Sequence, residues 1–204
     1  MVNPDFDSNS YVLEPSDSPF CWVIDFGFVG NLDQLSKAFD KPVAGVFLTH
    51  CHYDHICGLQ ALVTLFPECE LFGSPYTLTG IADSKLNLSY YKGFPVEIQH
   101  QRLRTIVDQE NIFLSESLSV QIYSTPGHNA GCLSFAIEQY LFTGDSLIPG
   151  HKLVTKLKSG NRAEGKLSRE KLIRLIDNES IICAGHGPPV LGKMFLNSPE
   201  EIHT

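Results

Sequence analysis

The chain has 204 residues, of which 43% are hydrophobic and 19% are charged, as in an ordinary globular protein. This length favours one domain over residues 1–204, because such a chain can bury a single sizeable core. The net charge of −8 at pH 7 disfavours nucleic acid or an anionic membrane as a partner, because both attract clustered Lys and Arg. The densest positive stretch, residues 152–171, is interrupted by neutral residues, and a local role in binding an anionic substrate stays open.

Two further features bear on the compartment. No apolar run approaches the roughly 18 residues of a membrane span, and the first seven residues have neither the basic nor the apolar region of a signal peptide. The six cysteines form no C-x-x-C pair and show no regular spacing, so we expect free thiols rather than a disulfide framework. These features favour a cytoplasmic protein.

Strands dominate the first half of the predicted elements. Residues 10–13 and 21–25 predict a hairpin across a turn rich in Pro and Ser, and residues 31–39 fit a short helix after a loop. The continuous apolar run 43–49 predicts a strand that is buried on both faces. Residues 58–66 then show helical spacing and end before a proline.

The second half continues with short strands. Residues 69–73 predict a strand, and residues 75–92 a mostly helical or irregular excursion. Residues 118–123 alternate like a half-buried strand, and residues 132–137 with 139–143 predict a second hairpin.

The last two predicted elements are a helix and a strand. The helix covers residues 169–176, with Ser168 as its N-cap, and the strand covers residues 181–184. The chain is therefore expected to be rich in strands, with helical segments inserted at intervals.

Seven side chains with nitrogen or carboxylate donors follow the predicted strands. They are His50, His52, Asp54, His55, His128, Asp145 and His186. The first four form an H-x-H-x-D-H cluster, and each of the other three comes directly after a glycine that permits a tight turn. Zn²⁺ and its neighbours in the first transition row take such ligands. Because loops at one edge of a rigid sheet can converge, the seven donors predict a metal centre.

The spacing within the cluster indicates two ions. His50 and His52 are two residues apart, so an extended backbone points both imidazoles the same way and the pair can hold one ion. Asp54 and His55, on the turn into the next helix, can reach a second ion.

The downstream residues can complete both sites. His128 and His186 are placed to supply the two missing donors, and the carboxylate of Asp145 can bridge both ions. Two such ions, roughly 3.5–4 Å apart, share a hydroxide that is a nucleophile at neutral pH.

This constellation resembles the metallo-β-lactamase superfamily over nearly the whole chain. The segments that carry the resemblance are the early strand at 9–13, the Asp-x-Gly turn at 23–27, the metal motif at 48–55, the Pro-Gly-His segment at 125–131, and residues 141–145 and 185–187. The resemblance implies an α+β protein with a four-layer αβ/βα sandwich, in which two mixed sheets lie face to face, helices lie outside, and the site is at one edge.

The resemblance also implies a division of the ligands. The first site would be His50, His52 and His128. The second would be Asp54, His55 and His186, with Asp145 as the bridge.

Within the superfamily, the Pro-Gly-His and Phe-Thr-Gly-Asp segments are most similar to the glyoxalase II-like (hydroxyacylglutathione hydrolase-like) branch. That branch has a C-terminal helical region that grips glutathione, whereas about 18 residues follow His186 here. Its Gly-Arg-x-Asp stretch has no clear match in residues 146–166. The resemblance therefore implies metal-dependent hydrolysis without fixing glutathione as the substrate.

The leading hypothesis is a binuclear hydrolase. A hydroxide bridging two divalent ions, Zn²⁺ in preference to Fe²⁺ or Mn²⁺, would attack the carbonyl of a small ester, thioester or lactone. Asp54 would orient this nucleophile and accept its proton, which makes it the candidate catalytic residue.

Two alternatives stay open. A mono-iron enzyme similar to persulfide dioxygenase would need only His50, His128 and Asp145. A metal-stabilised binding module would need an occluded site or a metal ion that does not exchange.

Several neighbouring residues are weaker candidates. Tyr53, inside the cluster, and His151, shortly after the bridging carboxylate, are weak candidates for substrate contact. The basic side chains that could bind an anionic substrate, or simply be solvated, are Lys152, Lys156 and Arg162. Cys51 and Cys57 flank the cluster, and we expect both to be packing residues because the nitrogen and oxygen donor set is complete without them.

Overall fold

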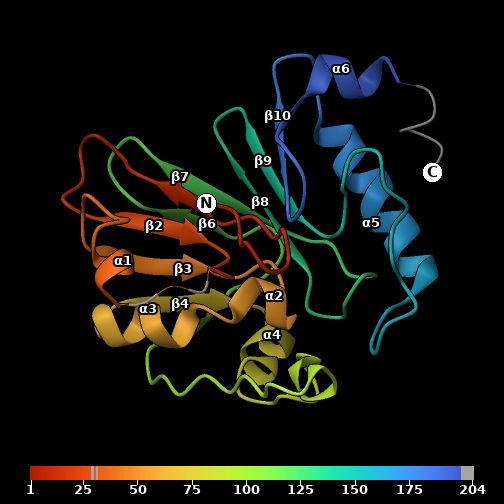
Figure 1. Ribbon diagram of the computed structural model, residues 1–204. Coiled ribbons are helices and arrows are strands. Elements are labelled where there is room, and N and C mark those ends of the chain that lie inside the picture. Colours follow the sequence, from red (N-terminus) through yellow and green to blue (C-terminus); the bar gives the residue numbers. More distant parts are fainter. Residues whose placement is uncertain (29, 31, 199–204) are drawn as a thin grey trace.

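The computed structural model describes residues 1–28, 30 and 32–198, and it contains two sheets that face each other (Figure 1). The first sheet has the order β1-β2-β3-β4-β5. Its strands are β1 Tyr11–Leu13, β2 Cys21–Ile24, β3 Val43–Phe47, β4 Glu70–Gly73 and β5 Leu103–Thr105. β1 is antiparallel to β2, whereas β2 to β5 are parallel and therefore end at the same edge.

The second sheet has the order β11-β10-β9-β8-β7-β6. Its strands are β6 Asn111–Phe113, β7 Ser119–Ser124, β8 Leu133–Ile137, β9 Tyr140–Gly144, β10 Ile181–Ala184 and β11 Val190–Leu191. β8 is antiparallel to both β7 and β9, and β10 is parallel to β9. Consequently β7, β9 and β10 run in one direction and end at a common edge.

Helices cover the outer face of each sheet (Figure 1). The first sheet carries α1 Leu32–Ser36 and α3 Leu59–Leu65, and the second carries α5 Arg162–Leu175 and α6 Gly192–Leu196. The remaining helices are α2 Tyr53–Ile56, α4 Pro75–Gly80 and the 3-10 helix η1 Ser89–Lys92. In the part of the chain that the structure describes, no helix is long and apolar enough to cross a membrane.

Three hydrophobic cores separate these four layers. Successive side chains of a strand point to opposite faces, so each buried strand contributes to two cores. In β2, Val23 packs under α1 and α3, whereas Ile24 packs between the sheets. In β9, Phe142 packs between the sheets, whereas Leu141 packs under α5 and α6. The predicted α+β four-layer sandwich is confirmed.

The edge where the parallel strands end is tied together by main-chain hydrogen bonds. Leu133 N donates to Thr49 O at 2.8 Å and thereby joins β8 to the end of β3. Asn9 N donates to Gly185 O at 2.7 Å, and the Asn9 side chain also donates to Ala184 O at 3.0 Å. These bonds hold segments from both sheets in fixed register at the place where the predicted ligands lie.

Two helix predictions need adjustment. The helix expected over 31–39 is the shorter α1, and residues 29 and 31 of the predicted loop and helix lie outside the described residues. The prediction that Ser168 caps a helix over 169–176 is wrong, because α5 begins at Arg162 with Asn161 as its N-cap.

The cap chemistry explains that error. The Asn161 side chain accepts from Ala163 N at 3.0 Å and Glu164 N at 3.3 Å. The first turns of α5 contain Gly165 and few apolar residues, so the sequence shows no helical period there. Ser168 instead donates to Pro126 O at 2.6 Å and ties the helix to the segment that precedes His128.

Candidate metal centre

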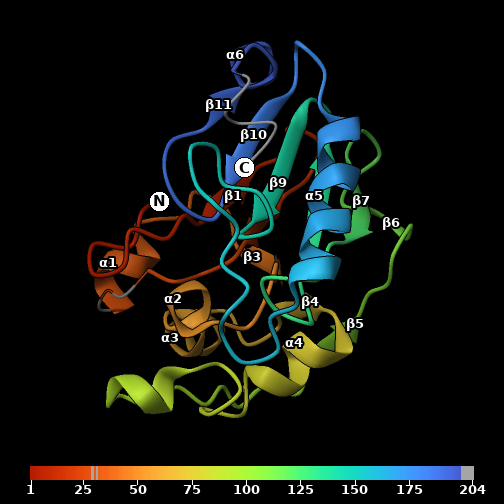
Figure 2. The same cartoon turned by 90° about the vertical axis from the view of Figure 1, so that its right-hand side faces the viewer.

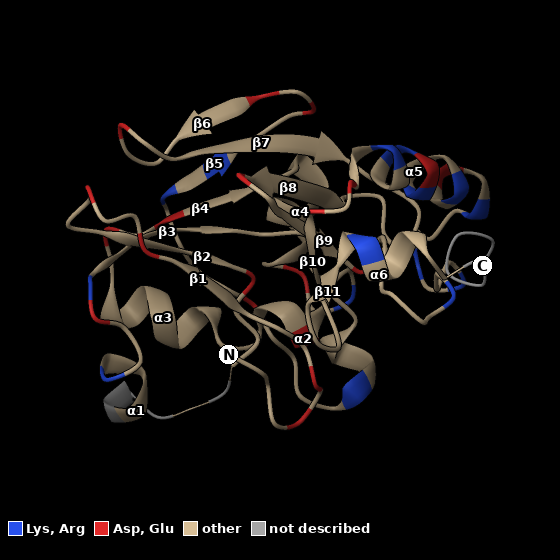
Figure 3. Cartoon of the chain, turned by 90° about the horizontal axis from the view of Figure 1, so that it is seen from above, with Lys and Arg blue, Asp and Glu red and all other residues tan. Residues whose placement is uncertain are grey.

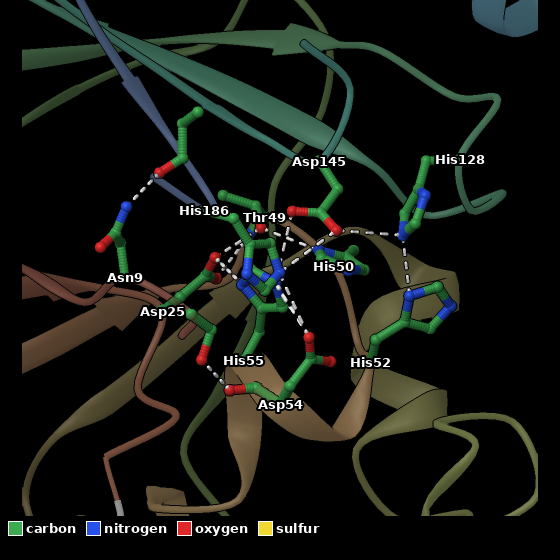
Figure 4. A network of polar contacts seen from close by, with 12 residues as sticks. Asn9, Asp25, Thr49, His50, His52, Asp54, His55, His128, Asp145 and His186 are labelled. Carbon is green, nitrogen blue, oxygen red and sulfur yellow. Dashed lines mark hydrogen bonds and ion pairs between the residues drawn. The ribbon is translucent and has the colours of Figure 1, made fainter. Parts of the chain in front are cut away.

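The seven predicted ligand side chains lie together at the edge where the strands end (Figure 4). β3 leads into His50 and His52, and α2 carries the next two ligands. The other three, His128, Asp145 and His186, follow β7, β9 and β10. Residues that are 136 positions apart in the sequence therefore meet because the strands before them end at one edge of the sandwich.

The first group contains three buried histidines. One ring nitrogen from each of His50, His52 and His128 lies within 4.8 Å of the others. His128 Nε2 and His52 Nδ1 are 2.9 Å apart, close enough to share a hydrogen when no ion lies between them. Two nitrogens bound to one tetrahedral Zn²⁺ would be about 3.3 Å apart, so a small adjustment would admit the ion.

The second group contains Asp54, His55 and His186, whose ligand atoms also lie within 4.8 Å of one another. Asp54 Oδ2 is 3.3 Å from His186 Nε2 and 3.7 Å from His55 Nε2. The group differs from the first in its carboxylate and in the partial exposure of Asp54 and His186.

Asp145 lies between the two groups. Its Oδ2 is 3.5 Å from His128 Nε2 of the first group and 3.7 Å from His186 Nε2 of the second. Its Oδ1 is 3.4 Å from His55 Nε2. A carboxylate placed in this way can contribute an oxygen to each of two ions.

The buried donors of this centre fit a metal. Within the described part of the chain, His50 Nε2, His55 Nε2 and Asp145 Oδ1 are buried and have no hydrogen-bond partner. Burying a polar atom without a partner costs about 1–3 kcal/mol. Three such atoms in one cluster therefore indicate that a ligand binds between them. Histidine nitrogens and carboxylate oxygens are donors that Zn²⁺, Fe²⁺ and Mn²⁺ accept.

Asp25 orients two of these ligands from behind. Its Oδ2 lies 2.9 Å from His55 Nδ1, and the same oxygen accepts from Thr49 Oγ1 at 2.6 Å. Thr49 Oγ1 is in turn 3.0 Å from His50 Nδ1. Holding the Nδ1 side of each ring in this way leaves Nε2 aimed at the centre, as second-sphere carboxylates do in metal sites. Asp25, His50 and His55 also have donors within 4.8 Å, but Asp25 faces Nδ1 of His55, so we assign it to orientation.

Main-chain carbonyls hold the two downstream histidines. His128 Nδ1 lies 2.9 Å from Val154 O, and His186 Nδ1 lies 3.2 Å from Asp7 O. The loop after β9 and the N-terminal loop therefore each fix one ligand ring.

Burial and charge set the protonation of the ligands. Burial lowers the pKa of His50 far below its usual range and that of His52 to about 3, so both rings are neutral and can donate a lone pair. Burial opposes charge on His55 too, but the carboxylates of Asp54 and Asp145 outweigh it and hold the His55 pKa well above its usual range. The same attraction, against burial, holds the pKa of Asp145 well below its usual range.

Comparison with known proteins identifies the family. Residues 3–186 match the model of the metallo-beta-lactamase superfamily. The chain belongs to the metallo-β-lactamase superfamily. This confirms the family that the sequence motifs suggested.

Individual members of the superfamily are similar along most of their length. Hydroxyacylglutathione hydrolase from Enterobacter sp. (strain 638) is 26% identical over 200 residues, which cover 97% of this chain and 70% of the relative. The crystal structure of the BLEG-1 B3 metallo-beta-lactamase has a TM-score of 0.85 at 24% identity and covers 100% of this chain and 97% of that one. That of TTHA1623 in a di-iron-bound form has a TM-score of 0.82 at 21% identity, with 98% of both chains covered. At these identities the two structures show a shared fold.

The weaker candidates for substrate contact in this superfamily member lie in different surroundings. The Tyr53 ring packs edge to face on Phe6, with ring centroids 5.0 Å apart, and on Phe94 at 5.6 Å, as a wall residue would. His151 lines a cavity of about 400 Å³ together with the ligands His128, Asp145 and His186. Lys152 lines that cavity and a second one, where it is joined by Lys156 and Arg162.

The six cysteines are free thiols, as expected. Burial raises the pKa of both Cys51 and Cys57 to about 11, so these thiols stay protonated near neutral pH. Cys57 Sγ donates to Gly27 O at 3.0 Å, and neither cysteine belongs to the two groups of donors.

Sequence reasoning overlooked the role of Asp25 and Thr49. The sequence motif places Asp25 only in an Asp-x-Gly turn, yet Asp25 follows the end of β2 just as the ligands follow the ends of their strands. That position was the available signal. Thr49 gave none, because a threonine at a strand end is common.

Proposed function

We propose that the chain is a binuclear metal-dependent hydrolase that cleaves the ester, thioester or lactone bond of a small acyl substrate. One observation carries the proposal: two groups of three donors flank a single carboxylate, Asp145. A site for one ion needs three or four donors, and seven in this arrangement suit two ions.

The residues divide between the ions as the family resemblance implied. His50, His52 and His128 would hold one ion, Asp54, His55 and His186 would hold the other, and Asp145 would contact both. Two divalent ions held there would supply a hydroxide nucleophile at neutral pH and polarise a carbonyl oxygen. Zn²⁺ is the expected metal, with Fe²⁺ or Mn²⁺ as alternatives, since TTHA1623 is described in a di-iron-bound form.

Asp54 is the candidate catalytic residue. Its pKa is lowered because His55 and His186 outweigh the effect of burial, so it is ionised near neutral pH. The oxygen of Asp54 that does not face His186 can then orient an attacking water and accept its proton. A group with these contacts would serve both as a ligand and as a base.

The shape of the site supports a small substrate. His50 and His55 are completely buried, so they close the floor of the centre to water. The cavity of about 400 Å³ begins at His128, Asp145 and His186, and therefore reaches the centre from one side. Its volume is within the usual range for small-molecule sites. The similarity to a hydroxyacylglutathione hydrolase favours a thioester as the first bond to test.

The first test is elemental analysis of the purified protein for Zn, Fe and Mn. We expect close to two ions per chain, mostly zinc, and turnover of at least one compound in a panel of thioesters, esters and lactones. Asp54→Ala should lower both the ion content and the turnover. A surface variant, Asp40→Asn, is the matched control, because Asp40 is exposed.

Two results would overturn the proposal. One iron per chain that stays bound in Asp54→Ala would indicate the mono-iron enzyme similar to persulfide dioxygenase. Two ions without turnover of any acyl compound would favour a metal-stabilised binding module.

A further inference from the structure

A second cavity, which we call the basic cavity, adjoins the one at the metal centre. It has a volume of about 660 Å³ and lies between α5 and the preceding loop, which Figure 2 shows running alongside the helix. The side chains that line it include Lys152, Lys156, Arg162, Lys166 and Arg169. Glu170 is its single acidic lining residue among the described residues. Residues 152–154 and 169 line both cavities, so the two cavities adjoin each other at this loop and this helix.

The charge of this region opposes that of the whole chain. Residues 152–174 contain eight of the 15 lysines and arginines but only two acidic residues, which gives the segment a net charge of +6. The whole chain carries −8, so the remaining residues carry −14. Figure 3 shows basic residues on α5 and on loops at the same end of the molecule. A positive pocket on a negative protein attracts anions to one place.

Arg169 is the most buried of the basic side chains that line this cavity. Its side chain is only 8% exposed, whereas the other basic side chains that line the cavity are exposed, and it lines both cavities. The planar fork of donors of a guanidinium matches the oxygens of a carboxylate or phosphate. Lys152, which is exposed, lies at the same junction and adds a flexible cation.

We propose that the basic cavity binds an anionic oxygen group, a carboxylate or a phosphate, at one end of the acyl substrate. Arg169 is the anchor, and Lys152 is the second contact on the side of the metal centre. The proposal rests on the proposed hydrolase function, because it places the reacting carbonyl near Asp145 and the anionic end beyond Arg169. The cations line a cavity of small-molecule size, which favours a small anion over a nucleic acid.

Three thioesters with the same acetyl group test this subsite. Their thiols are 4-mercaptobutanoate, 3-mercaptopropyl phosphate and the neutral 4-mercaptobutanamide. With the metal-loaded protein, we expect KM to be about ten- to a hundredfold lower for at least one of the two anions than for the amide, as for a charged hydrogen bond. The two anionic compounds distinguish a carboxylate from a phosphate.

The variants assign this preference to residues. Arg169→Gln and Lys152→Ala should each raise KM for the preferred anion by a clearly larger factor than KM for the amide. Arg174→Gln is the matched control, because Arg174 is on the same helix, has a 77% exposed side chain and lines neither cavity. If Arg169→Gln does not fold, as a thermal melt would show, the exposed Lys152 still provides the test. Equal KM values for all three compounds, or a preference that survives both substitutions, would overturn the proposal.

A binding measurement separates the two proposals. Calorimetric titration of the metal-loaded protein with glutarate and with glycerol 3-phosphate needs no turnover. Binding that weakens at least about tenfold in Arg169→Gln, and not in Arg174→Gln, supports the subsite even if no thioester is cleaved. Cleavage without any preference for an anion would support the hydrolase and reject the subsite.

Discussion

Asp25 offers a sharp test of the metal centre because it contacts a ligand without being one. The substitution is Asp25→Asn, which keeps the size and shape of the side chain. Asp25 has a φ of +50°, and Asn is one of the few residues that adopt this left-handed region readily. Any effect of the substitution should therefore come from the lost acceptor and the lost charge rather than from backbone strain.

The contacts set the size of the effect. The Asp25 carboxylate accepts from Thr49 N at 2.7 Å and Thr49 Oγ1 at 2.6 Å, and it lies 2.9 Å from His55 Nδ1. The amide of Asn has only one oxygen, so its NH₂ group must face either Thr49 N or His55 Nδ1. Each of these nitrogens carries a hydrogen when His55 binds a metal through Nε2. Two donors then face each other, and one hydrogen bond is lost. Replacing such an outer partner typically costs 10–100-fold in metal affinity, or about 1.4–2.7 kcal/mol.

The assay is competition for Zn²⁺ with a chromophoric chelator, together with elemental analysis after dialysis. We expect the ion at Asp54, His55 and His186 to weaken about 10–100-fold. The ion at the three histidines should change much less, because Asp25 reaches His50 only through Thr49. Unchanged affinity at both sites would refute the orienting role, and an equal loss at both would mean that Asp25 supports the fold rather than the His55 ring.

Two further predictions concern a glycine and an ion pair. A Cβ at Gly185 would lie 2.2 Å from Asp145 Oδ1 and 2.7 Å from His55 Cε1, so Gly185→Ala should lower metal affinity at least about tenfold, and full ion content after dialysis would contradict this. Burial opposes ionisation of Asp108, but Lys171 Nζ at 2.8 Å and a main-chain donor outweigh it, so its pKa is lowered on folding. The stabilisation is therefore present above the unfolded pKa near 4 and is lost as the pH falls through the lower folded pKa. Because Asp108 is 44% exposed, Asp108→Asn should lower the free energy of unfolding at pH 7 by less than about 1 kcal/mol. In urea titrations, the difference in this free energy between the variant and the original chain should disappear by about pH 2. An equal difference at pH 7 and pH 2 would contradict this.

The sequence predicted best those strands in which burial imposes a pattern of apolar residues. β3 and β7 appear in the sequence as an apolar run and as an alternation, because one is buried along most of its length and the other has one buried face. β5 and β6 lie at the outer edges of their sheets, and each has three residues that are mostly exposed. Neither has an apolar pattern, so neither was predicted.

The residues of the site also divide into those that the sequence could predict and those that it could not. The metal-binding side chains could be predicted because their donor types are distinctive and their spacing is tight. Asp25 and Arg169 could not, because their roles depend on what lies behind or beside them in space. A lone aspartate in a turn and one arginine among eight nearby cations have no distinguishing sequence feature.

The hydrogen bond from His128 Nδ1 to Val154 O has a thermodynamic consequence. Val154 lines both cavities, so the loop that holds a ligand ring is also a wall of the basic cavity. If an anion in that cavity fixes the loop, it must strengthen metal binding by the same factor by which the metal strengthens anion binding, because linkage between two equilibria is reciprocal. Metal affinity would then depend on whether substrate is present, and a metal titration without an anion would report only the weaker of two states.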